Sequence, residues 1–379
     1  MSATPTVRWT EEATPLSARW HSESRLPHPR RLVVADDRIR AATAHRLVCE
    51  GTALLWRGDY QGARQLLRAL ERRIDRKAPG PAATPAEAFH LQRRFRAHRA
   101  RTLGRLLVLL EADHSLALRR APDTRRACAD AYGPPTGPTL VPLRELLGVL
   151  GARQWRERGV EVPALGARIH PHYGVFAPVR GEYVDLVAEA PLPPGALAPG
   201  GGTAFDLGTG TGVLAAVLAR RGVPRLTATD LGPRARACAR ANLERLGLSG
   251  RVTVTGPELY PPGRADLIVC NPPWLPARPT STLEQGVYDP GGTMLHAFLS
   301  GARARLAPGG EAWLILSDLA EHLGLRTRTE LLEAITAAGL HILAHTTTHP
   351  THPRATDPTA PLHQARAAER TSLWRLGAA

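Results

Sequence analysis

The sequence predicts a protein of two parts, an all-α N-terminal domain followed by an α/β domain built on a doubly wound sheet of seven strands. Two observations predict this division. Between about residues 36 and 158, apolar residues recur at three- and four-residue steps, as they do on one face of an amphipathic helix. After about residue 165, short β-rich runs alternate with helical patterns, which is typical of βαβ units and a parallel sheet.

Length and composition exclude several classes of protein. A chain of 379 residues with 22% charged and 43% hydrophobic residues is globular, and it is long enough for two or three domains. No apolar run reaches the length of a spanning helix, and the first residues lack the apolar core of a secretory signal. The four cysteines form neither a disulfide framework nor a CxxC pair, so we expect a cytoplasmic protein.

The N-terminal part is distinguished by its charge. Residues 1–31 are rich in Pro, Arg, Ser and Thr without periodicity, and we interpret them as a flexible arm. Residues 32–165 form the predicted helical domain, in which Gly58 and Asp59 separate two helices. Residues 1–165 carry 29 basic and 17 acidic residues, a net charge of +12 out of +15 for the chain. This excess favours an acidic partner such as RNA, although solvated arginines explain it equally well. We interpret residues 32–165 as a substrate-recognition domain.

The second part, residues 166–379, has the alternation of a doubly wound sheet. We expect strands at residues 203–207, 225–230, 251–255, 265–270, 311–317, about 341–347 and 371–376. We expect helices at about 212–221, 232–247, 293–306 and 325–339. The last two strands therefore follow the last helix.

A glycine-rich loop joins the first strand to its helix. The run FDLGTGTG, from Phe205 to Gly212, ends a strand in an acidic residue and then alternates glycines. Glycine tolerates a positive φ and leaves room for a ligand against the backbone. The next strand ends in Asp230, whose carboxylate is placed to accept hydrogen bonds from ribose hydroxyls. The same residue type also caps a following helix, and the two interpretations are compatible.

These two features resemble the S-adenosylmethionine-dependent methyltransferases of the Rossmann-like class I. In that family the glycine loop holds the methionine part of the cofactor, so the resemblance places Asp206, Gly208 and Gly210 beside it. It places Asp230 on the ribose. An acidic residue after the third strand contacts adenine in the family, and Glu258 is the nearest candidate here. S-adenosyl-L-methionine is thus the expected cofactor.

The fourth predicted strand leads into the tetrapeptide NPPW, from Asn271 to Trp274. It matches the motif of methyltransferases that act on nitrogen in a planar, conjugated system. Such a nitrogen is a poor nucleophile, because its lone pair is delocalised. The Asn271 side-chain oxygen and the Pro272 carbonyl would accept hydrogen bonds from the NH₂ group and orient it. Trp274 would offer a flat face for stacking. Asn271, Pro272 and Trp274 are therefore the predicted catalytic residues.

The flanking sequences narrow the resemblance to the "methyltransferase small" group. That group includes HemK-type protein glutamine methyltransferases and ribosomal RNA guanine-N2 enzymes. Residues 174–184, with Arg180 and Glu182, resemble the HemK entry segment, although Val179 is inserted and Gly181 replaces a threonine. The run from Tyr288 to Gly292 resembles the same group. The resemblance assigns Arg180, Glu182, Asn271 and Trp274 to substrate binding.

The resemblance leaves the acceptor open. The leading interpretation is the N5 amide of a protein glutamine in the translation machinery. The main alternative is an amino group of an RNA or DNA base, such as guanine N2 or adenine N6, which the basic N-terminal domain would suit. A third interpretation is a docking protein that binds the cofactor without catalysis, and the intact NPPW argues against it. The oligomeric state is open too.

Several histidines have metal-like spacing. They are His170, His172, His345, His349 and His352. No cysteine or acidic partner lies near them in the sequence, and methyl transfer of this kind needs no metal. We therefore expect no metal site.

Overall fold

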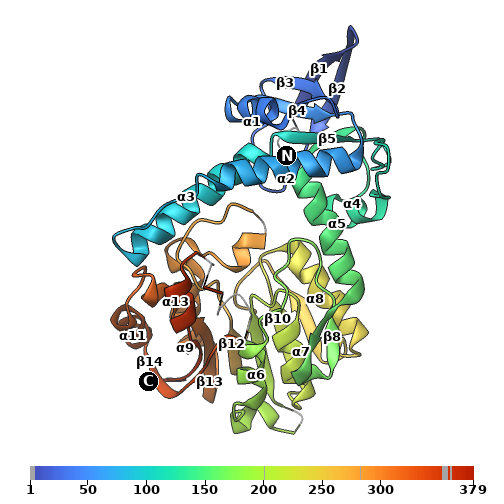
Figure 1. Cartoon of the computed structure of the whole chain (residues 1–379). Coiled ribbons are helices and arrows are strands. Elements are labelled where there is room, and N and C mark those ends of the chain that lie inside the picture. The colour runs from blue at the N-terminus through green and yellow to red at the C-terminus, as the bar shows by residue number, and fades with distance from the viewer. Residues whose placement is uncertain (1–4, 200, 282, 352–356, 359–360) are drawn as a thin grey trace. The chain divides into compact units, whose positions relative to one another are not determined.

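The structure is a computed structural model, and it describes residues 5–379 apart from 200, 282, 352–356 and 359–360 (Figure 1). The chain divides into two compact units. Unit 1 comprises residues up to 83 together with 87–154, and unit 2 comprises residues 84–86 and 155–379. The division falls inside helix α5 (Leu143–Arg158), whereas the sequence pattern places it after residue 165.

Unit 1 contains a six-stranded mixed sheet, so the prediction of an all-α domain is wrong. The order in the described sheet is β1-β2-β6-β5-β4-β3. Its strands are β1 (Thr6–Glu11), β2 (Thr14–Trp20), β3 (Leu32–Ala35), β4 (Ala53–Trp56), β5 (Leu106–Leu110) and β6 (Thr139–Pro142). Both β4 and β5 consist almost wholly of buried residues. A short, continuous apolar run does not distinguish a buried strand from a buried helix face, which explains the error.

The helices of unit 1 surround this sheet. They are α1 (Ala41–Cys49), α2 (Tyr60–Asp75), α3 (Pro85–Leu103), α4 (Arg125–Tyr132) and most of α5. Asp59 is not part of a turn between two helices. It follows β4 and caps α2, since its carboxylate accepts from the Gln61 N–H at 2.8 Å.

The interpretation of residues 1–31 as a flexible arm is also wrong for the part that the structure describes, because β1 and β2 form an antiparallel hairpin. Residues 1–4 lie outside the described residues. Val7 and Trp9 alternate with exposed residues and point to the buried side. The turn consists of Glu12 and Ala13, both with positive φ. Neither residue type is usual at these positions, so the hairpin carries no turn signal in the sequence.

Unit 2 has the predicted doubly wound sheet of seven strands, in the order β11-β10-β9-β12-β13-β15-β14 among its described residues. The strands are β9 (Thr203–Leu207), β10 (Arg225–Thr229), β11 (Val252–Thr255), β12 (Ala265–Cys270), β13 (Leu306–Ser317), β14 (Leu340–Thr348) and β15 (Thr371–Ala378). β15 runs antiparallel to β13 and β14, which flank it, and the other neighbouring strands of this sheet pair in parallel. This is the class I methyltransferase fold expected from the sequence. A separate hairpin, β7 (Val160–Val162) and β8 (Ala167–Ile169), precedes it.

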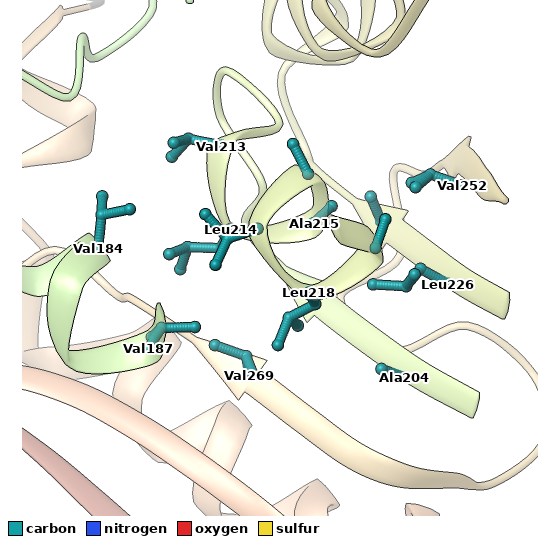
Figure 2. Packing of buried hydrophobic residues seen from close by; sticks show 14 of the residues in the cluster. Val184, Val187, Ala204, Val213, Leu214, Ala215, Leu218, Leu226, Val252 and Val269 are labelled. Carbon is teal, nitrogen blue, oxygen red and sulfur yellow. The ribbon is translucent and has the colours of Figure 1, made fainter. Parts of the chain in front are cut away.

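Helices cover both faces of the sheet. They are α6 (Glu182–Glu189), α7 (Val213–Arg220), α8 (Pro233–Arg245), α9 (Thr293–Arg305), α10 (Leu319–His322), α11 (Arg328–Ala337) and α13 (His363–Ala368). On one face, Val184 and Val187 of α6 meet Leu214 of α7 above Val269 of the sheet (Figure 2). On the other face, α9 and α11 bury a second apolar cluster around Phe298. Burial on both faces explains why the central strands are continuously apolar.

Among the described residues, no helix combines the length and the apolar character that a membrane span requires.

The packing of α9 predicts that replacing Phe298 will strongly lower the stability of unit 2. Its side chain is fully buried between α9 and the sheet. Phe298→Ala should lower the free energy of unfolding by about 3–5 kcal/mol, because it removes buried apolar surface and leaves a cavity. Leu332→Ala, at a side chain on α11 that is 37% exposed, should cost about 1 kcal/mol or less. Urea unfolding of both variants tests this, and equal losses would contradict the assigned core.

Candidate functional site

Three neighbouring strands of unit 2 end at the same level. In the parallel register, Leu207 of β9 pairs with Thr229 of β10 on one side and with Cys270 of β12 on the other. The loops that follow begin with Gly208, Asp230 and Asn271. The register therefore brings the predicted glycine loop, the predicted ribose carboxylate and the tetrapeptide together at the carboxyl edge of the sheet, where ligands bind in open α/β folds.

The glycine loop has the backbone that its sequence predicts. Gly208, Gly210 and Gly212 all have positive φ. A Cβ atom on Gly208 would lie 2.4 Å from the terminal methyl group of Met294 in α9, a flexible side chain that is able to move, so the positive φ is what favours glycine there. A Cβ atom on Gly210 would meet nothing within 4 Å. The backbone is therefore open for a ligand at Gly210, and the tip of Met294 lies over it at Gly208.

Asp206 acts within the loop. Its carboxylate is 1% exposed and accepts from the Thr209 hydroxyl at 2.6 Å and from the Ala215 N–H at 3.0 Å. These bonds join the end of β9 to the loop and to the first turn of α7. Burial raises the pKa of Asp206 to about 6. The sequence predicts this residue beside the cofactor, and the structure gives it the role of bracing the loop from beneath.

Asp230 is half-buried and faces the loop. One carboxylate oxygen accepts from the Gly210 N–H at 3.0 Å, and the other accepts from the Gly232 N–H at 2.8 Å. Burial raises its pKa above the ordinary value. Each oxygen keeps a second lone pair, so both are able to accept from hydroxyl groups of a ligand. The N-cap of α8 is Gly232, so Asp230 does not occupy that position.

Glu258 lies in the loop after β11. That strand pairs with β10 as far as Thr255 and Thr229, so its loop also leaves the carboxyl edge of the sheet. Glu258 is exposed and, among the described residues, forms no ion pair. The predicted contact with adenine stays a proposal.

An internal hydrogen bond fixes the conformation of the tetrapeptide. Pro272 is buried, and the Asn271 side-chain oxygen accepts from the Trp274 indole N–H at 2.8 Å. The chain beyond it folds back, since Leu275 bridges to Tyr288. The sequence predicts a stacking role for Trp274. The structure adds a second role, because the indole N–H sets the orientation of the Asn271 side chain.

Arg180 covers the Trp274 ring, with its guanidinium carbon 5.0 Å from the ring centre. The guanidinium donates to Glu182 at 2.8 Å and to Glu369 at 3.1 Å. Both carboxylates are almost fully buried. Arg180 and Glu182, predicted as substrate contacts, thus lie against the tetrapeptide as parts of an ion-pair network.

The sequence did not predict the other members of this network. Glu369 also accepts from the Ser317 hydroxyl at 2.6 Å. No motif marks Glu369 or Ser317. They meet because Ser317 at the end of β13 pairs with Thr371 at the start of β15. Only the long-range pairing of these two strands brings Glu369 to the site.

One carboxylate oxygen of Glu182 has no partner. Its Oε1 accepts from Arg180, whereas its Oε2 is buried and has no hydrogen bond within the described part of the chain. The two carboxylates and one guanidinium leave a net negative charge. Leaving a buried oxygen unsatisfied costs about 1–3 kcal/mol, which an N–H donor on a ligand would relieve.

No group of three or more His, Cys, Asp or Glu side chains suited to a metal ion occurs among the described residues. His170 Nδ1 lies 2.7 Å from the Arg156 carbonyl oxygen, and His345 stacks on Trp374 at 3.8 Å. His352 lies outside the described residues.

Comparison with known proteins agrees with this geometry. Residues 192–336 match the family model "Methyltransferase small domain". The chain is 38% identical over 145 residues to the ribosomal protein L11 methyltransferase of Pelotomaculum thermopropionicum, covering 38% of this chain and 39% of that protein. It is 38% identical over 133 residues to the release factor glutamine methyltransferase of Cereibacter sphaeroides, covering 31% and 48%.

A third relative is named for an RNA substrate. The chain is 32% identical over 116 residues to the ribosomal RNA small subunit methyltransferase C of Alcanivorax borkumensis, covering 30% of this chain and 32% of that protein. The chain therefore spans less than half of the length of each of these three relatives. These matches confirm the resemblance to the methyltransferase small group. The residues that match the family model fall in unit 2.

The buried state of Asp206 predicts a pH-dependent stability. Its pKa of about 6 in the folded protein exceeds the ordinary 3.8, so the folded state binds the proton more tightly than the unfolded state. Stability should therefore fall as the pH rises from about 4 to about 6. Asp206→Asn keeps an acceptor oxygen for Thr209 but does not titrate. Relative to this variant, the wild type should lose about 3 kcal/mol between about pH 4 and pH 7.

Urea unfolding of the two proteins across this pH range measures the difference. Parallel pH profiles for wild type and Asp206→Asn would contradict the assignment of a raised pKa to this carboxyl group.

Proposed function

We propose that this chain, which carries a methyltransferase small domain over residues 192–336, transfers a methyl group from S-adenosylmethionine to a planar amide or amino nitrogen of a macromolecule. The observation that carries the proposal is the register of β9, β10 and β12, which starts the glycine loop, Asp230 and the NPPW tetrapeptide side by side. This arrangement puts groups suited to a nucleoside next to groups suited to an NH₂ donor.

The chain's residues fit the cofactor. The open backbone at Gly210 would lie against its methionine part, and Asp230 would accept from the ribose hydroxyls. Glu258 would contact the adenine. When bound, S-adenosylmethionine supplies an electrophilic methyl carbon and takes the C–S electron pair as the N–C bond forms.

Asn271 and Pro272 would orient the attacking nitrogen. The Asn271 oxygen already accepts the Trp274 N–H, and its second lone pair remains for an acceptor N–H. The Pro272 carbonyl would accept the other N–H. Two acceptors in a stiff turn hold the nitrogen in line without reorganisation, which is the main source of rate enhancement available here. The proton that leaves the methylated nitrogen is acidic enough to pass to water.

The network around Arg180 would shape the acceptor site. Trp274 is only partly buried, so a planar group would stack on the part of its ring that Arg180 and the apolar clusters leave uncovered. The unpartnered oxygen of Glu182 supports its proposed contact with the acceptor, because it needs an N–H donor. Glu369 and Ser317 would act by holding Arg180 in place.

The leading acceptor is a protein glutamine. It is supported by the resemblance of residues 174–184 and 288–292 to HemK-type enzymes and by the similarity to release factor glutamine methyltransferases. The expected partner is then a protein of the translation machinery. A base amino group in RNA is the second candidate. It is supported by the net charge of +12 on residues 1–165 and by the similarity to a ribosomal RNA methyltransferase.

Two substitutions separate binding from transfer. Asn271→Ala should lower turnover by about 100-fold or more, because it removes a preorganised acceptor, and should leave cofactor affinity unchanged. Asp230→Ala should weaken cofactor binding about tenfold or more, because it removes a charged hydrogen-bond acceptor. Calorimetric titration and steady-state turnover measure the two effects.

Trp274→Phe removes the indole N–H but keeps a ring for stacking, so it should lower turnover less than Asn271→Ala and leave cofactor affinity unchanged. Turnover that survives in Asn271→Ala would refute the role of Asn271, whereas cofactor binding by the wild type without any turnover would favour a docking protein. Unaltered cofactor affinity in Asp230→Ala would refute the ribose contact.

Transfer of labelled methyl groups identifies the acceptor. A lysate of the source cell lacking this gene is incubated with the purified protein or with Asn271→Ala, and the product is split between protease and nuclease. Label that survives nuclease but not protease supports the protein acceptor. Label that survives protease but not nuclease overturns it in favour of a base. Equal labelling by the Asn271→Ala variant would refute transfer by this site.

A further inference from the structure

Unit 1 carries exposed arginines on two adjacent helices. On α2 and just beyond it, Arg68, Arg72 and Arg76 follow at four-residue steps and are exposed. Four residues rise about 6 Å along a helix, so these side chains line one face. On α3, Arg94 and Arg101 are exposed on one face, two turns apart, and Arg96 is exposed on another face. They belong to a stretch from residue 88 to 110 that holds six arginines and no acidic residue.

An ion pair ties the two helices together. Arg99 of α3 donates to Asp75 of α2 at 2.7 Å and lies 3.3 Å from Glu71. The two helices therefore form one folded pair. We call the exposed arginines of this pair the α2–α3 surface and define it by Arg68, Arg72, Arg76, Arg94, Arg96 and Arg101. Within the described part of the chain, these six side chains form no ion pair, so their charges remain available.

The positive field acts on a neighbouring group. His45 of α1 has a lowered pKa, first because of burial and then because of the charges of Arg73 and Lys77 at the end of α2. The positive charge near α2 therefore extends beyond the six arginines that define the α2–α3 surface.

The same surface lacks the apolar centre of a protein interface. Among the described residues of unit 1, Val33 is the single large apolar side chain that is highly exposed, and it lies on β3. Stable protein interfaces bury an apolar and aromatic core. A surface of arginines without such a core fits the phosphate backbone of a nucleic acid, to which guanidinium groups bind bidentately.

We propose that the α2–α3 surface of unit 1 binds RNA through its phosphate backbone. Contacts of this kind carry no sequence information, so the binding is expected to tolerate changes of RNA sequence. The proposal concerns unit 1 alone. It holds for either acceptor, because RNA binding would bring the enzyme to an RNA base or to a protein held on an RNA-containing particle.

The test is a binding titration of the full chain without cofactor. The probe is a labelled single-stranded RNA of mixed sequence, about 16 nucleotides long. The variant carries Arg68→Gln, Arg72→Gln, Arg94→Gln and Arg96→Gln. The matched control carries Arg220→Gln, Arg245→Gln, Arg264→Gln and Arg303→Gln, which removes the same charge from exposed positions in unit 2. All three proteins are titrated between about 50 and 200 mM salt.

Wild type and control should bind with affinities that fall steeply with salt. The α2–α3 variant should bind at least tenfold more weakly, and its slope of log affinity against log salt should be smaller by about 0.7 for each lost contact. Equal affinity and slope in this variant and the wild type would overturn the proposal, as would no binding by the wild type at low salt. An equal loss in the control would also overturn it. Cofactor titration of the same samples is independent, so this failure is distinguishable from failure of the methyltransferase assignment.

Discussion

The site of unit 2 depends on the parallel register of three strands. Leu207, Thr229 and Cys270 are paired across β9, β10 and β12, so the three loops that carry the chemistry leave the sheet at one level. A shift of one residue would turn every side chain of a strand to the opposite face and misplace its loop. Apolar packing holds the register, because β9 and β12 bury side chains in the clusters on both faces of the sheet, and β10 buries Leu226 and Ala228 in the cluster under α7.

Polar groups beneath and beside this edge give the loops their shape. Asp206 stays buried at a raised pKa, and it ties the glycine loop to α7. Arg180 joins Trp274 to two carboxylates from distant parts of the chain. A buried carboxylate is expensive unless it is paired or hydrogen-bonded, so these groups are present at a cost to stability. These groups surround the glycine loop and the tetrapeptide. We therefore relate their cost in stability to the positioning of the site residues.

Local motifs account for what the sequence could predict. The glycine loop, Asp230 and Asn271 each follow a strand with clear alternation or burial, and the seven strands of the large sheet of unit 2 were predicted to within five residues. The fold of unit 1 was predicted wrongly because its core strands, such as Leu106–Leu110, are apolar runs that also fit a buried helix. The turn at Glu12 and Ala13 has no usual turn residue. The contact of Glu369 with Arg180 could not be predicted from the sequence, because only the long-range pairing of β13 with β15 brings the two residues together.

Hydrogen exchange tests the central claim most directly, namely that one edge of the sheet assembles the cofactor site. The full chain is compared with and without S-adenosylmethionine. Amide protection should increase in the loops after β9, β10 and β12, around Gly210, Gly232 and Asn271, because a bound ligand suppresses local opening there. The strands of unit 1 should be unchanged. Protection absent from these three loops, or confined to unit 1, would contradict the account.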